Sequence, residues 1–83
     1  RTPWGPADGK TVYGDGIVKY YAPGHHGFHV DRKRNAKIHP ALRAACGEGA
    51  WYEEDCSWSA VAFTHQELFT SREIRLATET LKN

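Results

Sequence analysis

The chain has 83 residues, of which 40% are hydrophobic and 12% aromatic, and its formal net charge is +1. This composition is that of a globular domain and excludes a disordered polar chain. The longest apolar run, Ala60 to Phe63, is too short to cross a membrane, and we expect one soluble domain spanning residues 1–83.

Charge is distributed unevenly along the sequence. Residues 1–45 contain eight Lys and Arg against three Asp and Glu, whereas residues 46–83 contain three against seven. This asymmetry excludes a uniformly acidic DNA mimic and a uniformly basic nucleic-acid binder. Either the folded surface is bipolar and suits a partner with a charged patch, or the two halves neutralise each other in the fold.

The first half of the chain predicts an arm followed by three strands. The opening TPWGPADG, with two prolines and two glycines around Trp4, predicts an extended arm that docks one ring. Two β-rich runs flank Gly14-Asp15-Gly16, which is a strong hairpin signal because glycine supplies the positive φ of such turns. The segment 26–31 (HGFHVD) predicts a third strand with Phe28 and Val30 on one face.

The second half predicts helices. Asp31 is a suitable N-cap for a short helical turn over 32–37, and Pro40 fits the first turn of a short helix over 41–46. The longest periodic segment, 53–69, has an apolar stripe at helical spacing and an acidic start that suits the helix dipole. Ser71 caps a final helix over 72–82.

These elements predict an α+β fold, in which a small antiparallel sheet of about three strands packs against two C-terminal helices. Large rings must provide much of the burial in a chain this short. The aromatic residues expected in the core are Phe28, Trp51, Trp58 and Phe63.

Five histidines and two cysteines raise the question of a metal site. Structural zinc sites take ligands in close pairs, and neither Cys46 nor Cys56 has a near partner. His25 and His29 would form an i, i+4 pair only on a helix, which the neighbouring glycines disfavour. We therefore expect no metal and no other cofactor, and we expect both cysteines to be buried thiols and not a disulfide.

A catalytic site is a second alternative. A metal- or His-dependent hydrolase would be centred on His25, His29 and Glu54, with a histidine base and a carboxylate that orients it. His26 is a further candidate for the base, and Glu53 or Asp55 for the carboxylate. No G-x-S-x-G, H-E-x-x-H, P-loop or dinucleotide motif accompanies them. We therefore favour a protein that is not an enzyme.

Two blocks of the sequence carry a family resemblance. The segments HHGFHVDRKRNA…HPALR (25–43) and GAWYEEDCSW (49–58), with the opening TPWGP, resemble a small uncharacterised domain of plasmid and phage proteins. Its pattern is G-H-G-G-[FI]-H-[LV], an R-N run, P-x-x-L-R and G-W-Y-E-E-D-C-x-W, and the match covers about residues 2–70, nearly the whole chain. The family commonly has glycine where this chain has His26, so His26 is a poor candidate for a shared function.

The resemblance implies a phage or mobile-element setting and no particular reaction. Free-standing domains of this size in that setting are similar in style to anti-CRISPR proteins, which bind Cascade subunits or Cas nucleases and block target-DNA binding or cleavage, usually without catalysis. The implied function is a non-enzymatic inhibitor of a bacterial defence complex, acting in the cytoplasm of a bacterial host. A homodimer is compatible with this picture, because a short sheet leaves edges to cover.

Two charged segments are the expected contacts with such a protein partner. The basic segment would dock on an acidic protein surface, and the acidic segment would face a basic nucleic-acid channel. The basic patch is Arg32, Lys33, Arg34 and Lys37. The acidic patch is Glu53, Glu54 and Asp55. Direct binding of nucleic acid, with Tyr20 or Tyr21 stacking on bases, is the remaining alternative.

Overall fold

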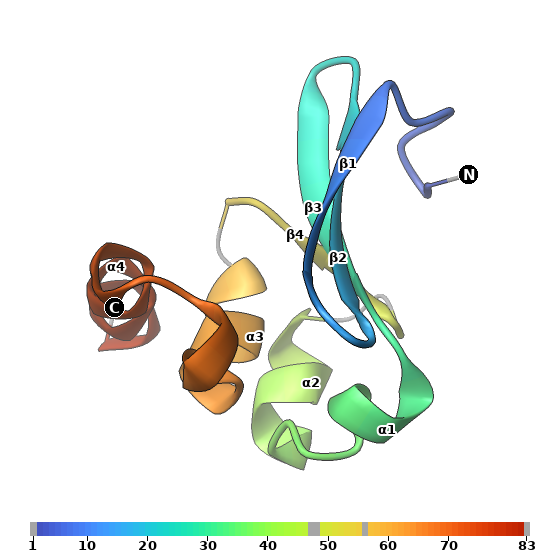
Figure 1. Ribbon diagram of the computed structural model, residues 1–83. Coiled ribbons are helices and arrows are strands. Elements are labelled where there is room, and N and C mark those ends of the chain that lie inside the picture. The colour runs from blue at the N-terminus through green and yellow to red at the C-terminus, as the bar shows by residue number, and fades with distance from the viewer. Residues whose placement is uncertain (1, 47–48, 56, 83) are drawn as a thin grey trace.

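The structure is a computed structural model that describes residues 2–46, 49–55 and 57–82. Within these residues, four strands form one antiparallel sheet in the order β1-β2-β3-β4 (Figure 1). The strands are β1 (Gly9–Gly14), β2 (Ile17–Ala22), β3 (His25–Val30) and β4 (Trp51–Glu53). The helices are α1 (Arg32–Asn35), α2 (Pro40–Cys46), α3 (Trp58–Thr64) and α4 (Ser71–Lys82), with a 3₁₀ turn, η1 (Gln66–Leu68), between the last two. The predicted α+β class is confirmed, and the sheet has four strands instead of about three.

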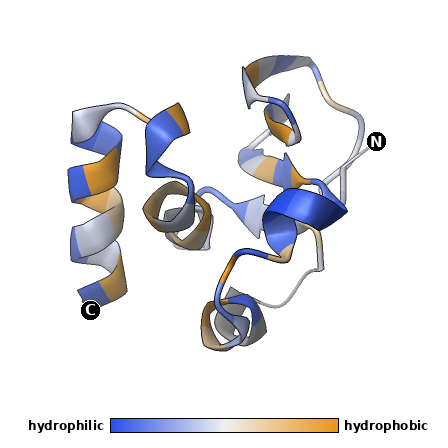
Figure 2. Ribbon diagram, turned by 60° about the horizontal axis from the view of Figure 1, so that its bottom comes forward, coloured by the Kyte–Doolittle hydropathy of each residue, from blue (hydrophilic) through white to orange (hydrophobic). Residues whose placement is uncertain are grey.

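Helices cover one face of the sheet and one of its ends. α3 lies between the sheet and α4, whereas α1 and α2 lie beyond the end at which β3 finishes (Figure 1). α1 begins directly after β3. Asp31 is its N-cap, as predicted, and its side chain accepts a hydrogen bond from the Arg34 N–H (2.8 Å). α4 is amphipathic along its length (Figure 2), and its Ala77 is fully buried.

The hairpin predicted at Gly14–Gly16 forms, and a second hairpin joins β2 to β3. β1 and β2 are joined through Gly16, whose φ is +88°, and β2 and β3 are joined through Gly24, whose φ is +77°. Both values lie in the left-handed region that glycine adopts without strain. The register shifts between Val12 and Gly14, and the ring of Tyr13 packs against Phe28 and Phe69.

The segment predicted as one helix over 53–69 is instead a strand, a turn, a short helix and a 3₁₀ turn, so that prediction is wrong. Tyr52 pairs with Phe28 across the sheet and is 1% exposed, while Trp51 lies beside His29 with its ring on the other face. This alternation is that of a strand, and it adds the fourth strand to the sheet. α3 begins only at Trp58, so the acidic residues before it are not its first turn.

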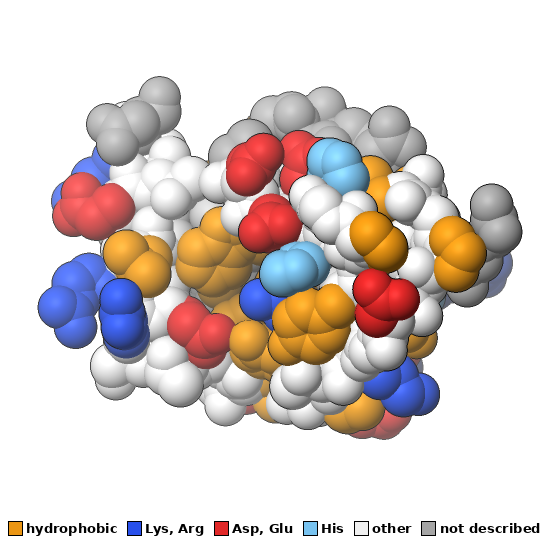
Figure 3. Space-filling view, turned by 90° about the horizontal axis from the view of Figure 1, so that it is seen from above, with side chains coloured by type: hydrophobic (Ala, Val, Ile, Leu, Met, Phe, Trp, Pro, Cys, Tyr) orange, Lys and Arg blue, Asp and Glu red, His pale blue; other side chains and the backbone are white. Residues whose placement is uncertain are grey.

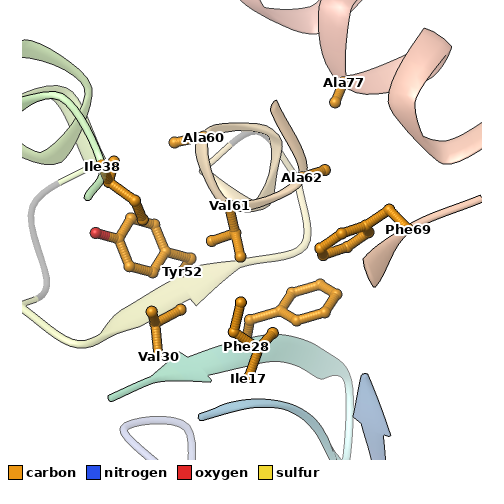
Figure 4. Packing of buried hydrophobic residues seen from close by; sticks show 10 residues of the cluster. All are labelled: Ile17, Phe28, Val30, Ile38, Tyr52, Ala60, Val61, Ala62, Phe69 and Ala77. Atoms are coloured by element: carbon orange, nitrogen blue, oxygen red, sulfur yellow. The ribbon is translucent and has the colours of Figure 1, made fainter. Parts of the chain in front are cut away.

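The core lies between the sheet and α3. Val61 points from α3 toward Tyr52 and Phe28, with Ile38 beside Tyr52 and Phe69 beside Phe28 (Figure 4). The other buried hydrophobic members of the cluster are Ile17, Val30, Ala60, Ala62 and Ala77. A core of this size fits a chain of 83 residues, in which a few fully buried side chains must provide much of the stability.

The expectations for single core residues have mixed outcomes. Phe28 is 2% exposed, as predicted, whereas Trp51 and Trp58 are only half-buried. Phe63 is 46% exposed, so its assignment to the core is wrong. The expectation for the cysteines falls on Cys56 and the side chain of Cys46, which lie outside the described residues. None of the described helices has the length and hydrophobicity needed to cross a membrane.

Candidate functional site

The predicted basic patch lies on and just after α1, at the end of the sheet where β3 finishes. Arg32, Lys33 and Lys37 are exposed, and no ion pair joins them to another described residue. The front of the molecule in Figure 2 accordingly carries a short, strongly hydrophilic helix. These three cations are available to a partner.

Arg34, the fourth member of the predicted patch, is engaged in the fold. Its Nε donates to the carbonyl oxygen of Asp15 (2.9 Å), and its Nη1 donates to a carboxylate oxygen of Glu67 (3.0 Å). A backbone hydrogen bond in the first place, and also the Arg34 guanidinium, lower the pKa of the Glu67 carboxyl. Arg34 therefore ties the first hairpin to η1 in addition to any role at the surface.

The buried His65 also contacts Arg34. Its side chain is only 2% exposed, and its Nε2 lies 2.9 Å from the carbonyl oxygen of Arg34. The other ring nitrogen, Nδ1, lies 3.5 Å from Nη1 of Arg34. A buried polar ring of this kind is tolerated because both nitrogens have partners.

The acidic patch lies beside the opposite end of β3. Glu53 ends β4, and the exposed Glu54 and Asp55 form the turn after it. Glu54 extends the ladder: its N–H donates to the carbonyl oxygen of His26 (3.0 Å), and its Oε2 accepts from the His26 N–H (2.8 Å). Since β3 has six residues at about 3.3 Å each, the acidic turn and α1 are roughly 20 Å apart.

The three residues at the centre of the hydrolase hypothesis, His25, His29 and Glu54, are not brought together. The ring of His25 stacks on Trp4 and the ring of His29 meets Trp51 edge-on, whereas Glu54 lines a cavity on the opposite, helix-covered face. Glu54 instead has His26 as its neighbour, with Nδ1 and Oε1 3.8 Å apart. His26, at the position where the resembling family has glycine, adopts ordinary strand backbone. Among the described residues, no three His, Cys, Asp or Glu side chains are placed to hold a metal ion.

The two tyrosines considered for base stacking both have intramolecular partners. Tyr20 packs its ring against Trp51, with the centroids 5.6 Å apart. Tyr21 shares a hydrogen bond between its hydroxyl and the Thr11 hydroxyl (2.8 Å) and meets the ring of His26 edge-on. Because Tyr20 and Tyr21 are consecutive residues of β2, their side chains lie on opposite faces of the sheet.

Sequence reasoning missed a cavity of about 200 Å³ between the helix-covered face of the sheet and the helices, which we call the Lys19 cavity. Figure 3 shows a hollow on this side of the molecule with acidic, basic and hydrophobic side chains around it. The lining residues are Tyr13, Lys19, Phe28, Glu54, Trp58 and Glu73. Three strands, two helices and one turn contribute them, so no local sequence pattern reveals the site.

The polar groups of the Lys19 cavity are held in place by hydrogen bonds. Tyr13 donates its hydroxyl to Oε2 of Glu73 (2.8 Å). Burial first, and then this hydrogen bond and the negative charge of Glu73, raise the pKa of the Tyr13 phenol well above its ordinary value, so its proton stays in place. Oε1 of Glu73 also accepts from the Thr70 N–H (2.9 Å), while the Glu73 N–H donates to the Thr70 hydroxyl (3.1 Å). Thr70 therefore caps α4, so the prediction that Ser71 is the cap is wrong by one residue. The Thr70–Glu73 capping box was the available sequence signal for Glu73.

Lys19 is the cation of the cavity. Its ammonium lies 5.4 Å from the centroid of the Tyr21 ring and 5.8 Å from that of Phe28, which are cation–π distances. No ion pair joins Lys19 to a carboxylate of the described residues. Two carboxylates and one ammonium therefore line the cavity, with aromatic rings between them.

Fold and site together define a small α+β domain with oppositely charged ends and a polar cavity. The chain belongs to the family described as "Domain of unknown function (DUF7007)", which matches residues 1–83. This agrees with the small uncharacterised domain family that the sequence resembles. No curated protein and no solved structure matches the chain.

Proposed function

We propose that this chain acts by docking on a partner protein through its charged ends, and that the partner is a bacterial defence complex of the CRISPR effector type. The observation that carries the proposal is the exposure of Arg32, Lys33 and Lys37 on one short segment, with no carboxylate paired to them among the described residues. Clustered exposed cations steer association with an acidic surface and favour one orientation.

The spacing of the charged ends supports a partner that carries both signs of charge. The acidic turn of Glu54 and Asp55 lies roughly 20 Å from α1, as the length of β3 requires. An effector complex holds its nucleic acid in a positively charged channel, which the acidic turn would face while α1 contacts an acidic surface of the same complex. A domain that occupies both would block access to the channel.

Action by binding, without chemistry, is supported by where the reactive side chains lie. His25 and His29 contact Trp4 and Trp51 on the open face of the sheet, away from Glu54. A general base needs the group that orients it within hydrogen-bond reach. The surface is therefore better suited to contact than to turnover.

Target-DNA binding by purified effector complexes, with and without the protein, tests the proposal. The variant Arg32→Glu/Lys33→Glu reverses the basic patch, and Arg72→Glu/Arg75→Glu reverses two exposed arginines on α4 as a control with the same change of net charge. We expect the wild type and the control to block DNA binding and the patch variant to lose the effect.

Two results would count against the proposal. One is that the wild-type protein leaves DNA binding unchanged in every effector type tested; the other is that both reversals behave alike. If the protein alone shifts short DNA, and this binding weakens steeply with salt, direct nucleic-acid binding replaces the proposed function.

A further inference from the structure

We propose that the Lys19 cavity receives one arginine side chain of the partner protein. This inference rests on the proposed function only in assuming that the partner is a protein. The cavity lies at the acidic end of the domain, since Glu54 belongs both to its lining and to the acidic turn.

The size of the cavity limits what it can hold. Its volume is about 200 Å³, whereas pockets that bury a whole drug-sized ligand have roughly 300–1,000 Å³. One inserted side chain therefore fits better than a free cofactor or metabolite. Arginine is among the residues that most often serve as interface anchors.

The aromatic lining already accommodates a cation. The Lys19 ammonium rests 5.8 Å from the ring centroid of Phe28, which lines the cavity, and 5.4 Å from that of Tyr21, which lies on the same face of the sheet. Trp58 and Tyr13 add further ring surface to the same cavity. A planar guanidinium stacks on such rings more effectively than an ammonium does.

Both carboxylates are held in position before any ligand arrives. Glu73 is fixed by the Tyr13 hydroxyl (2.8 Å) and the Thr70 N–H (2.9 Å), and Glu54 is fixed by the His26 N–H (2.8 Å). A pre-organised acceptor loses little entropy on binding, and a guanidinium donates to carboxylates in paired hydrogen bonds.

The charge balance selects a cationic ligand. Glu54 and Glu73 supply two negative charges and Lys19 one positive charge, so the lining carries a net negative charge that one guanidinium neutralises. Lys19 competes with the incoming cation for the ring of Phe28. Removing its charge should therefore tighten binding of a guanidinium and would weaken binding of any anionic or zwitterionic ligand.

The test is an NMR titration of the 83-residue protein with N-acetyl-arginine amide, following the indole N–H signal of Trp58. N-acetyl-citrulline amide has nearly the same shape without the charge and serves as the ligand control. The variants are Glu54→Gln, Lys19→Met and, as a matched control, Glu79→Gln, which removes a carboxylate from the exposed side of α4. The amide spectrum of each variant confirms that it is folded.

We expect the arginine probe to saturate the Trp58 signal and the citrulline probe to bind about tenfold more weakly, because a hydrogen-bonded charge is lost. Glu54→Gln should weaken binding of the arginine probe by about tenfold, Lys19→Met should tighten it several-fold, and Glu79→Gln should leave it unchanged. Equal binding of both probes, weaker binding to Lys19→Met, or no shift at Trp58 would each overturn the inference. The titration contains no effector complex, so a negative result would contradict the arginine site without contradicting the proposed function.

Discussion

The indole ring of Trp4 lies against the backbone of Gly27, so the N-terminal arm is docked on β3 at a position without a side chain. A Cβ on Gly27 would overlap the ring of Trp4 and come within 3.0 Å of the carbonyl oxygen of Tyr52. Trp4 also contacts Trp51 and His25. Glycine at position 27 therefore allows the arm to cover the open face of the sheet.

Substitution of Gly27 by alanine should displace the arm. We expect the tryptophan emission to move to longer wavelength and the free energy of unfolding to fall by about 1–3 kcal/mol, as is usual for overpacking. Gly9→Ala on β1 is the matched control, since a Cβ there meets only Tyr21 at an ordinary 3.8 Å. Equal emission spectra for Gly27→Ala and the wild type would contradict the docked arm.

Truncation of Arg34 should separate its structural role from that of its neighbours. Arg34→Ala removes the hydrogen bonds to Asp15 and Glu67 and should lower the free energy of unfolding by about 1–2 kcal/mol in urea denaturation. The exposed Lys33→Ala should change it by less than about 0.5 kcal/mol. If the two variants are equally stable, Arg34 belongs with the free cations of α1 after all.

Two truncations within α3 test which of its sides faces the core. Val61 is fully buried and Phe63 is 46% exposed, although Phe63 is the larger side chain. We expect Val61→Ala to cost about 2 kcal/mol and Phe63→Ala less than about 1 kcal/mol. Thermal or urea unfolding measures both free-energy changes. A larger cost for Phe63→Ala than for Val61→Ala would show that Phe63 belongs to the core.

The partly buried hydrogen bond between Tyr13 and Glu73 should make the protein sensitive to alkaline pH. The folded state raises the pKa of the Tyr13 phenol, so this contribution is complete below the ordinary tyrosine pKa of about 10 and is lost as the pH rises above it. Above that pH the unfolded chain loses a proton that the folded chain keeps, and the free energy of unfolding falls. Urea denaturation across this range should show a steeper fall for the wild type than for Tyr13→Phe; parallel curves would contradict the assignment.

The sequence predicted what depends on local pattern. The Gly14–Gly16 hairpin, the third strand with Phe28 and Val30 on one face, and the Asp31 cap all form as expected. The prediction of secondary structure failed at β4. A strand of three residues is too short for its alternation of buried and exposed side chains to stand out against the helical spacing that follows. That error placed the acidic patch at a helix start, whereas Glu54 is hydrogen-bonded to His26 beside the sheet.

The candidate site was predictable only in part, because contacts between residues that are distant in the sequence leave no local pattern. The exposed cations of α1 follow from their sequence, but the second role of Arg34 depends on Asp15 and Glu67, which are distant in the chain. The Lys19 cavity depends on residues from Tyr13 to Glu73 meeting in space. Neither relationship has a local signal.

The stoichiometry of inhibition tests the central claim most directly. Increasing amounts of the protein are added to a fixed amount of a purified defence effector complex, and the remaining target-DNA binding is measured at equilibrium. A docking protein should abolish binding in proportion to the amount added and reach a plateau near one equivalent per binding site. Inactivation of many complexes by a small fraction of an equivalent, or no loss of DNA binding at any ratio, would contradict the account.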